Sequence, residues 1–292
     1  MKKLIRLFII TIVLYSCSGG QKISNDIITV SISPFKYFVE AIGGSDFRVN
    51  VMVPAGADPH IYEPAPGQIT ALRRSVAFIS DGYLGFEITW LDRFYETNSR
   101  MIKLSLGENI DLIEAEEHRA GDHSEGADPH FWISPGSAKI IAESVKSLLI
   151  SLKPDSSDKY ERNYRILADT IDYYDKKAVS LFSDYQGKSF MIFHPALGYL
   201  SRDYGINQVA VEQEGKEPTP STMKELIDVA RNENIRIILI QKGFDVKNAG
   251  AIASEIGAEL YEIDPLDENW PQTVSDILNA IHKSLEKSRA DY

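Results

Sequence analysis

Three histidines in distinctive local sequences are the residues of this chain best suited to chemistry. His60 and His130 each follow an Asp-Pro pair, and His194 lies in the segment Phe-His-Pro-Ala-Leu-Gly-Tyr. A fourth segment, Tyr-Glu-Ile-Asp-Pro-Leu, supplies the carboxylate of Asp264, and successive members of this set lie 70, 64 and 70 residues apart. Neutral imidazoles and a carboxylate suit a four-coordinate divalent transition metal such as zinc, whereas calcium and magnesium prefer oxygen ligands. The sequence therefore predicts a metal site with one ligand from each quarter of the chain.

The elements that must position these residues alternate between strand-like and helix-like patterns. Short apolar runs predict strands at 27–32, 49–53, 76–79, 189–193, 208–211, 235–240 and 260–263. Helical periodicity predicts helices near 35–42, 140–149, 223–230, 249–256 and 274–285. Strand and helix in alternation are typical of an α/β fold in which helices cover both faces of parallel sheets.

One long helix is predicted between the two halves of the chain, from Asp155 to Tyr185. Apolar residues recur there at steps of three and four without Gly or Pro. Such a helix, ~45 Å long, spans two domains as a stiff strut, the alternative being an ordinary surface helix within one domain. We expect an N-terminal α/β domain over 24–152, the linking helix over 153–186 and a C-terminal α/β domain over 187–292.

The strand pattern brings the four ligand candidates together. His60, His194 and Asp264 each follow the carboxyl end of a predicted strand, which is the edge where open parallel sheets bind ligands. His130 lies just before a helix that Ser134 and a following proline mark. Two ligands come from each half, so we expect the metal in the cleft between the domains. Acidic side chains near these histidines in sequence, available to orient the rings, are Asp58, Glu63 and Asp128.

The first residues read as an export signal over 1–16. Two lysines and an arginine precede an apolar run at 7–14, and the segment Leu-Tyr-Ser-Cys that follows resembles the lipobox of bacterial lipoproteins. Cys17 is the only cysteine, which excludes a disulfide framework and makes it the expected site of acylation. The alternative is an ordinary cleaved signal followed by an incidental cysteine.

The mature chain is acidic and has no further membrane-spanning pattern. Without the signal, 28 basic residues face 42 acidic ones, a formal charge of −14, which argues against nucleic acid as a partner. No other stretch reaches the ~18 uninterrupted apolar residues that a transmembrane helix needs. We therefore expect an extracytoplasmic protein held on a lipid bilayer through Cys17.

Taken together, the histidine segments, the Asp-Pro-Leu turn and the lipobox resemble the substrate-binding lipoproteins of bacterial ABC importers for zinc and manganese. The resemblance covers the chain from the lipobox to the C-terminus. It implies two α/β domains joined by one long, rigid backbone helix, with a single metal in the cleft. It also implies His60, His130 and His194 as ligands, Asp264 as the fourth, and delivery of the metal to a permease with a cytoplasmic ATPase. We expect a monomer.

Zinc is the expected cargo and manganese the alternative. A histidine at the third ligand position, His194, resembles the zinc-type proteins, whereas manganese-type members more often carry glutamate there. The chain departs from the zinc pattern in its short loop 114–128, whose histidines are only His118 and His123, so a metal-collecting role for this loop is not expected. A second departure is Gln-Lys-Gly-Phe at 241–244, where many relatives have Glu-Pro-Gln-Phe, and its role stays open.

Two other classes of function are compatible with three histidines. A surface-anchored zinc hydrolase would keep water at the open coordination position, with Asp264 or Glu63 as general base. The chain lacks the His-Glu-x-x-His, Gly-x-Ser-x-Gly and phosphate-loop motifs of many such enzymes. A metal-independent adhesin would leave the histidines incidental. Binding without catalysis is the leading hypothesis.

Overall fold

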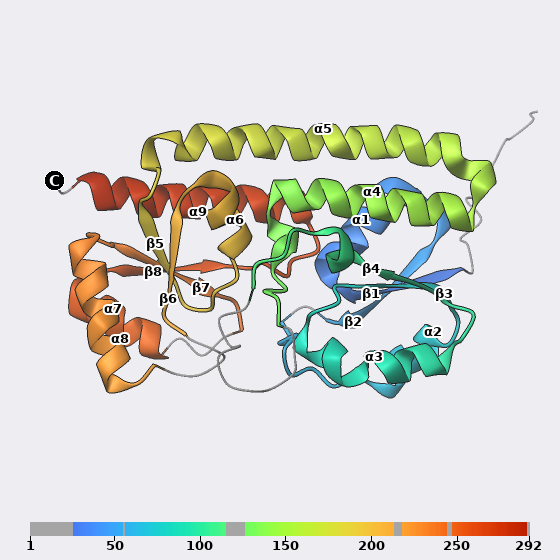
Figure 1. Ribbon diagram of the computed structural model, residues 1–292, viewed down its shortest axis with the longest axis horizontal. Helices are drawn as coiled ribbons and strands as arrows, with labels where there is room; N and C mark the ends of the chain where they lie inside the picture. The colour runs from blue at the N-terminus through green and yellow to red at the C-terminus, as the bar shows by residue number, and fades with distance from the viewer. Residues whose placement is uncertain (1–25, 55, 115–125, 213–217, 244–246, 291–292) are drawn as a thin grey trace, which may run out of the picture.

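The computed structural model describes residues 26–54, 56–114, 126–212, 218–243 and 247–290 (Figure 1). The signal segment, Cys17, His118 and His123 therefore lie outside the described residues. Across the described ranges, none of the helices is both long enough and apolar enough to cross a bilayer.

Two four-stranded sheets form the two halves of the molecule, and every strand pair is parallel. The strand order is β2-β1-β3-β4 in the first sheet and β6-β5-β7-β8 in the second. The strands are β1 (Ile27–Ile32), β2 (Arg48–Val53), β3 (Ser75–Ser80), β4 (Ile102–Ser105), β5 (Ser189–Ile192), β6 (Asn207–Ala210), β7 (Ile237–Gln241) and β8 (Glu259–Ile263).

Helices connect these strands and cover the sheets, as Figure 1 shows. They are α1 (Ser33–Gly43), α2 (Pro66–Leu72), α3 (Gly85–Thr97), α4 (Pro135–Leu152), α5 (Ser157–Phe182), α6 (Gly198–Tyr204), α7 (Pro220–Asn232), α8 (Lys247–Ile256) and α9 (Trp270–Ala290). Short 3-10 turns flank α5 at Pro154–Ser156 and Ser183–Tyr185, and another, Phe131–Ile133, follows His130.

Strand β5 shows why the central strands of the second sheet, β5 and β7, read as continuous apolar runs. In β5, Phe190 and Ile192 belong to the core that contains the buried face of α9, whereas Met191 belongs to a separate core with Leu226 of α7 and Ile252 of α8. Successive side chains of a strand point to opposite faces, so a sheet covered on both sides needs apolar residues at every position. The predicted α/β class with parallel sheets is confirmed.

The long helix predicted between the halves is present as α5. It has 26 residues, or ~39 Å at 1.5 Å per residue, and runs along both halves in Figure 1. Its buried face includes Tyr160, Leu167 and Ile171. The domain boundaries that we expect on either side of it stay predictions.

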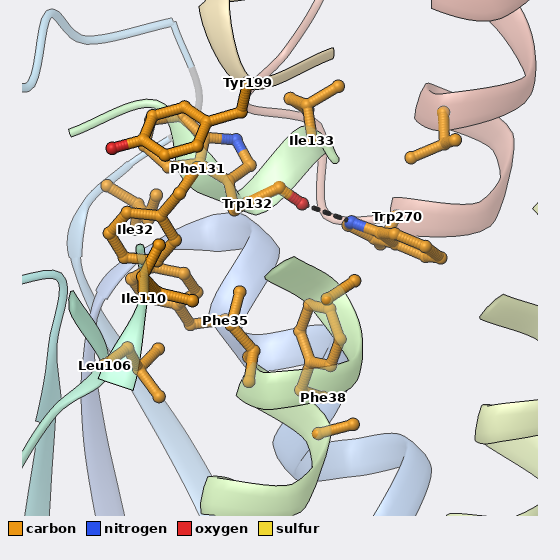
Figure 2. Close-up of a cluster of buried hydrophobic side chains, with 14 of the residues drawn as sticks. Ile32, Phe35, Phe38, Leu106, Ile110, Phe131, Trp132, Ile133, Tyr199 and Trp270 are labelled. Atoms are coloured by element: carbon orange, nitrogen blue, oxygen red, sulfur yellow. Dashed lines mark hydrogen bonds between the residues drawn. The ribbon is translucent and has the colours of Figure 1, made fainter. Parts of the chain in front are cut away.

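One hydrophobic core joins the two halves, because residues of both sheets, α5 and α9 belong to the same buried cluster. Figure 2 shows the part of this core where Trp132 meets Trp270, whose indole N–H donates a 2.7 Å hydrogen bond to the Trp132 carbonyl. The Trp132 indole donates in turn to the carbonyl of Pro265 at 2.9 Å. Both indoles are buried, so the loop after His130 is fastened to the turn after Asp264.

Candidate metal centre

Three of the four predicted ligands converge. His60, His130 and His194 each offer a ring nitrogen, and these three atoms lie within 4.8 Å of one another. The ring centroids are 5.0 to 5.4 Å apart, and the rings are inclined to one another by 53° to 75°. His130 and His194 are buried and His60 is partly buried. The histidines thus surround one point between the first and second halves of the chain.

The repeated Asp-Pro-His sequence has a local structural cause. The Asp58 carboxylate accepts a 2.8 Å hydrogen bond from the backbone N–H of His60, and Asp128 accepts one of the same length from His130. An aspartate that binds the backbone two residues on closes a tight turn. Each turn therefore fixes the backbone conformation from which its histidine side chain extends.

Carboxylates also orient two of the rings. Asp128 Oδ1 lies 2.7 Å from His130 Nδ1, and Glu212 Oε2 lies 3.1 Å from His194 Nδ1. An ionised carboxylate only accepts hydrogen bonds, so each Nδ1 carries the proton and each Nε2 keeps its lone pair. Burial acts to raise the pKa of Asp128, but its interactions with His130 outweigh burial and the pKa lies below its usual value.

The lone pairs of these rings face one another. His130 Nε2 and His194 Nε2 are 3.2 Å apart, and His60 Nε2 is buried with no hydrogen-bond partner among the described residues. Burial and the neighbouring histidines lower the pKa of His60 to about 3, and burial lowers the pKa of His194. The charged forms of His60 and His194 are therefore disfavoured, and these two residues present neutral imidazoles to a cation.

The spacing of these nitrogens fits zinc. Zinc–nitrogen bonds of about 2.0 to 2.1 Å at tetrahedral angles place two ligand atoms roughly 3.3 Å apart. The 3.2 Å between His130 Nε2 and His194 Nε2 matches this edge. A cation between the three rings would give His60 Nε2, which has no hydrogen-bond partner among the described residues, a metal bond, and the ring nitrogens of His130 and His194 lie close enough to bind the same ion, so the residues present fit it.

Two glycines allow close approaches at this centre. A Cβ on Gly85, at the start of α3, would lie 2.4 Å from the carbonyl oxygen of His60. A Cβ on Gly198, at the start of α6, would lie 2.9 Å from a carboxylate oxygen of Asp128. The helix starts therefore pack directly against the two Asp-Pro-His turns, and a larger residue would displace them.

The end of β7 holds the backbone of His194. The Gln241 side chain accepts from the His194 backbone N–H at 3.2 Å and donates to the His194 carbonyl at 2.7 Å. Both ends of one buried amide are thus used on a single predicted ligand. The strand pairing of β5 with β7 is what brings Gln241 beside His194.

A buried acidic pair lies behind the His60 turn. Glu87, in the first turn of α3, accepts hydrogen bonds from the backbone N–H groups of Asp81 and Gly82 at 2.9 and 2.6 Å and from the Ser31 hydroxyl. Asp81 is fully buried, and its Oδ2 has no hydrogen-bond partner within the described part of the chain. Burial raises the pKa of Glu87 to about 7, and burial together with Glu87 raises that of Asp81 well above its usual value.

Asp264 is placed differently from the histidines and is not a member of the group within 4.8 Å. Its Oδ2 pairs with Lys242 Nζ at 3.0 Å, and its Oδ1 accepts from the backbone N–H of Leu266 at 3.2 Å. Of the three acids considered for orienting the rings, Asp128 contacts a ring, Asp58 binds only backbone, and Glu63 is exposed. Glu212 was missed, although it follows the predicted strand 208–211 just as the ligands follow theirs.

Comparison with known proteins places the chain in a family. Residues 28–287 match the family described as "ZnuA: Zinc-uptake complex component A periplasmic". A crystal structure of ZnuA is 36% identical, covers 89% of this chain and 98% of its own, and superimposes with a TM-score of 0.82. A putative metal-binding protein of Chlamydia muridarum is 28% identical over 92% of this chain and 95% of its own length.

A further relative is the zinc-binding lipoprotein AdcA of Streptococcus pneumoniae, 26% identical over 87% of this chain. The match covers only 53% of AdcA, so the chain spans about half of that protein. The residues of the family match include both sheets, apart from the first residue of β1, and all three histidines. The chain therefore belongs to the ZnuA family of periplasmic zinc-uptake components.

Proposed function

We propose that this protein binds Zn²⁺ outside the cytoplasm as cargo and delivers it to the permease of an ATP-driven importer, without catalysing a reaction. The observation that carries the proposal is the convergence of three imidazole nitrogens, two of them 3.2 Å apart. Neutral imidazole is a good zinc ligand, and binding would relieve the buried lone pairs of His60, His130 and His194.

Zinc is favoured over manganese by the chemistry of the ligand group. The ring nitrogens within 4.8 Å of one another come from histidines only, and manganese prefers carboxylate, carbonyl and water oxygens. Asp264, the oxygen ligand that the family resemblance implies, has both carboxylate oxygens engaged with other groups. The acylation of Cys17 and a monomeric state remain proposals.

Binding is favoured over hydrolysis by the way the nearby carboxylates are used. Asp128 and Glu212 are bound to ring N–H groups, and Asp264 is paired with Lys242. A general base needs a carboxylate free to take a proton from metal-bound water. Hydrolysis of ester or phosphate substrates by the zinc-loaded protein, with loss of this activity in Glu63→Gln, would instead favour a hydrolase.

The first experiment is elemental analysis of the signal-free protein beside a triple variant, His60→Ala/His130→Ala/His194→Ala. We expect about one zinc per wild-type chain and none in the triple variant. His282→Ala is the matched control, because His282 lies in α9 and pairs with Glu286 at 3.6 Å. A wild type that takes up neither zinc nor manganese would refute the binding function.

The transport step needs a test in cells. Cells that lack this gene should accumulate radioactive zinc slowly, and the wild-type gene should restore uptake whereas the triple variant should not. Restoration that persists in cells without the importer's permease would refute delivery to it. Excess manganese should compete weakly with zinc in the same assay, and strong competition would favour the manganese alternative.

A further inference from the structure

The register of the second sheet places Lys242 beside Asp264. β7 and β8 pair in parallel with Gln241 opposite Ile263, and the Lys242 backbone N–H donates to the Ile263 carbonyl at 3.0 Å. Lys242 and Asp264, the residues that follow these two strand ends, therefore lie opposite one another. Their side chains meet, with Lys242 Nζ 3.0 Å from Asp264 Oδ2.

This contact leaves neither carboxylate oxygen of Asp264 without a donor. Oδ2 binds the ammonium of Lys242, and Oδ1 accepts from the Leu266 backbone N–H at 3.2 Å. To bind a metal held by the three histidines, Asp264 would have to move into a group of which it is not a member, and this movement would act against its ion pair with Lys242. The Lys242 charge would also repel a divalent cation that approached the same carboxylate.

The same strand end acts on both kinds of ligand candidate. Gln241 binds the backbone N–H and carbonyl of His194, which fixes an imidazole that faces the centre. The adjacent Lys242 binds the carboxylate that lies outside the group of three histidines. Two of the four residues at 241–244, whose role the sequence leaves open, therefore contact one ligand candidate each.

We propose that Lys242 determines metal selectivity by holding Asp264 out of the coordination sphere, an inference that rests on the proposed function. The ion is then bound by three imidazoles, and its fourth position is left to a ligand from outside the protein. Zinc accepts three protein nitrogens with an open position, whereas manganese loses the carboxylate oxygen that it prefers. Lys242 thereby weakens manganese binding more than zinc binding.

The size of the effect follows from the exposure of the pair. The Lys242 side chain is 56% exposed and that of Asp264 is 28% exposed. Ion pairs of this kind shift an equilibrium by up to about fivefold, less at high salt. Lys242→Met should therefore raise manganese affinity by about threefold to fivefold and zinc affinity by less than about twofold.

The test measures manganese and zinc affinity by competition with a chromophoric chelator at low ionic strength. The variants are Lys242→Met, Asp264→Asn, the double variant, and Lys242→Arg as the control that keeps the charge. The manganese gain should appear in Lys242→Met, disappear in the double variant and be absent in Lys242→Arg. The absorption spectrum of bound Co²⁺ should change between wild type and Lys242→Met, as a new oxygen ligand changes the coordination geometry.

Three results would overturn the inference. An equal gain in the double variant would show simple charge repulsion of the metal, without a role for Asp264 as a ligand. An unchanged affinity and an unchanged Co²⁺ spectrum in Lys242→Met would show that Lys242 does not withhold Asp264. A wild type that already shows Asp264-dependent metal affinity would do the same. In each case zinc binding by the wild type would still support the proposed zinc-binding function. That function fails if neither the wild type nor any of these variants binds zinc.

Discussion

Glu212 offers a direct test of how the site is built, through the substitution Glu212→Gln. The carboxylate is buried and lies 3.1 Å from His194 Nδ1, where it accepts a hydrogen bond from the ring N–H. Glutamine has nearly the same shape but is neutral and carries N–H donors as well as an acceptor. It therefore weakens the hydrogen bond that orients the His194 ring. It can also stabilise the other tautomer, in which Nε2 carries the proton and cannot bind metal.

The expected loss can be worked out from this one contact. A hydrogen bond to a charged group contributes about 1.5 to 3 kcal/mol, and one between neutral groups about 0.5 to 1.5 kcal/mol. The difference of about 1 to 1.5 kcal/mol corresponds to a loss of zinc affinity approaching tenfold. This value lies at the lower end of the ~10 to 100-fold losses typical of residues that orient metal ligands.

The assay is a zinc titration against a chromophoric chelator, at a pH where the histidines are neutral. Glu259→Gln is the matched control, because Glu259 is exposed at the opposite end of β8 from Asp264 and pairs with Lys287. We expect the control to bind as the wild type does. If Glu212→Gln bound zinc within about twofold of the wild type while folding normally, the argument that this carboxylate sets the His194 tautomer would be refuted.

Two further predictions concern the region behind His60. The folded protein holds protons on Asp81 and Glu87 that the unfolded chain releases, so the contribution of this pair to the free energy of unfolding should fall from pH 4.5 to about 7, by up to about 3 kcal/mol for Glu87, whereas the lowered pKa of His60 contributes in the opposite direction. In denaturant titrations of the metal-free protein at pH 5 and 7.5, Asp81→Asn should remove part of this fall in the free energy of unfolding. The histidines contribute equally to both proteins, so an identical change with pH in the variant and the wild type would contradict the assignment. Gly85→Ala places a Cβ 2.4 Å from the His60 carbonyl and should lower zinc affinity, whereas Gly67→Ala, with open space around its Cβ, should not; equal affinities for the two variants would argue against the helix contact.

The sequence predicted the fold best where apolar patterning was strong. The runs now seen as β1, β5 and β7 are buried on both faces, so their composition alone distinguishes them from loops. The edge strand β4 reads Ile-Lys-Leu-Ser and is half exposed, and only its pairing with β3 makes it a strand. The helix α3 was also missed, because its buried residues Phe86, Glu87 and Phe94 do not form a simple apolar stripe.

The site was predictable to the extent that chemistry and strand ends determine it. His60, His130 and His194 were found from residue type and local sequence, and the structure brings them together. Glu212 was missed because a single glutamate after a strand carries no motif, and its role depends on β5 and β6 being neighbours. The Lys242–Asp264 pair likewise requires the register of β7 against β8, which a sequence pattern does not specify.

The three imidazoles are held unequally, and from this difference we expect a particular order of metal binding and release. The rings of His130 and His194 each have a carboxylate on Nδ1, whereas the His60 ring makes no hydrogen bond within the described residues, and its neighbour Ile61 is 79% exposed. Rotating the His60 ring breaks no hydrogen bond of that ring within the described residues, although it changes the ring's packing against His130 and His194. We expect His60 to be the last ligand to bind an arriving ion and the first to leave it. The dissociation rate would then be set by the opening of one solvent-facing turn, while the shared core keeps the other two ligands in place.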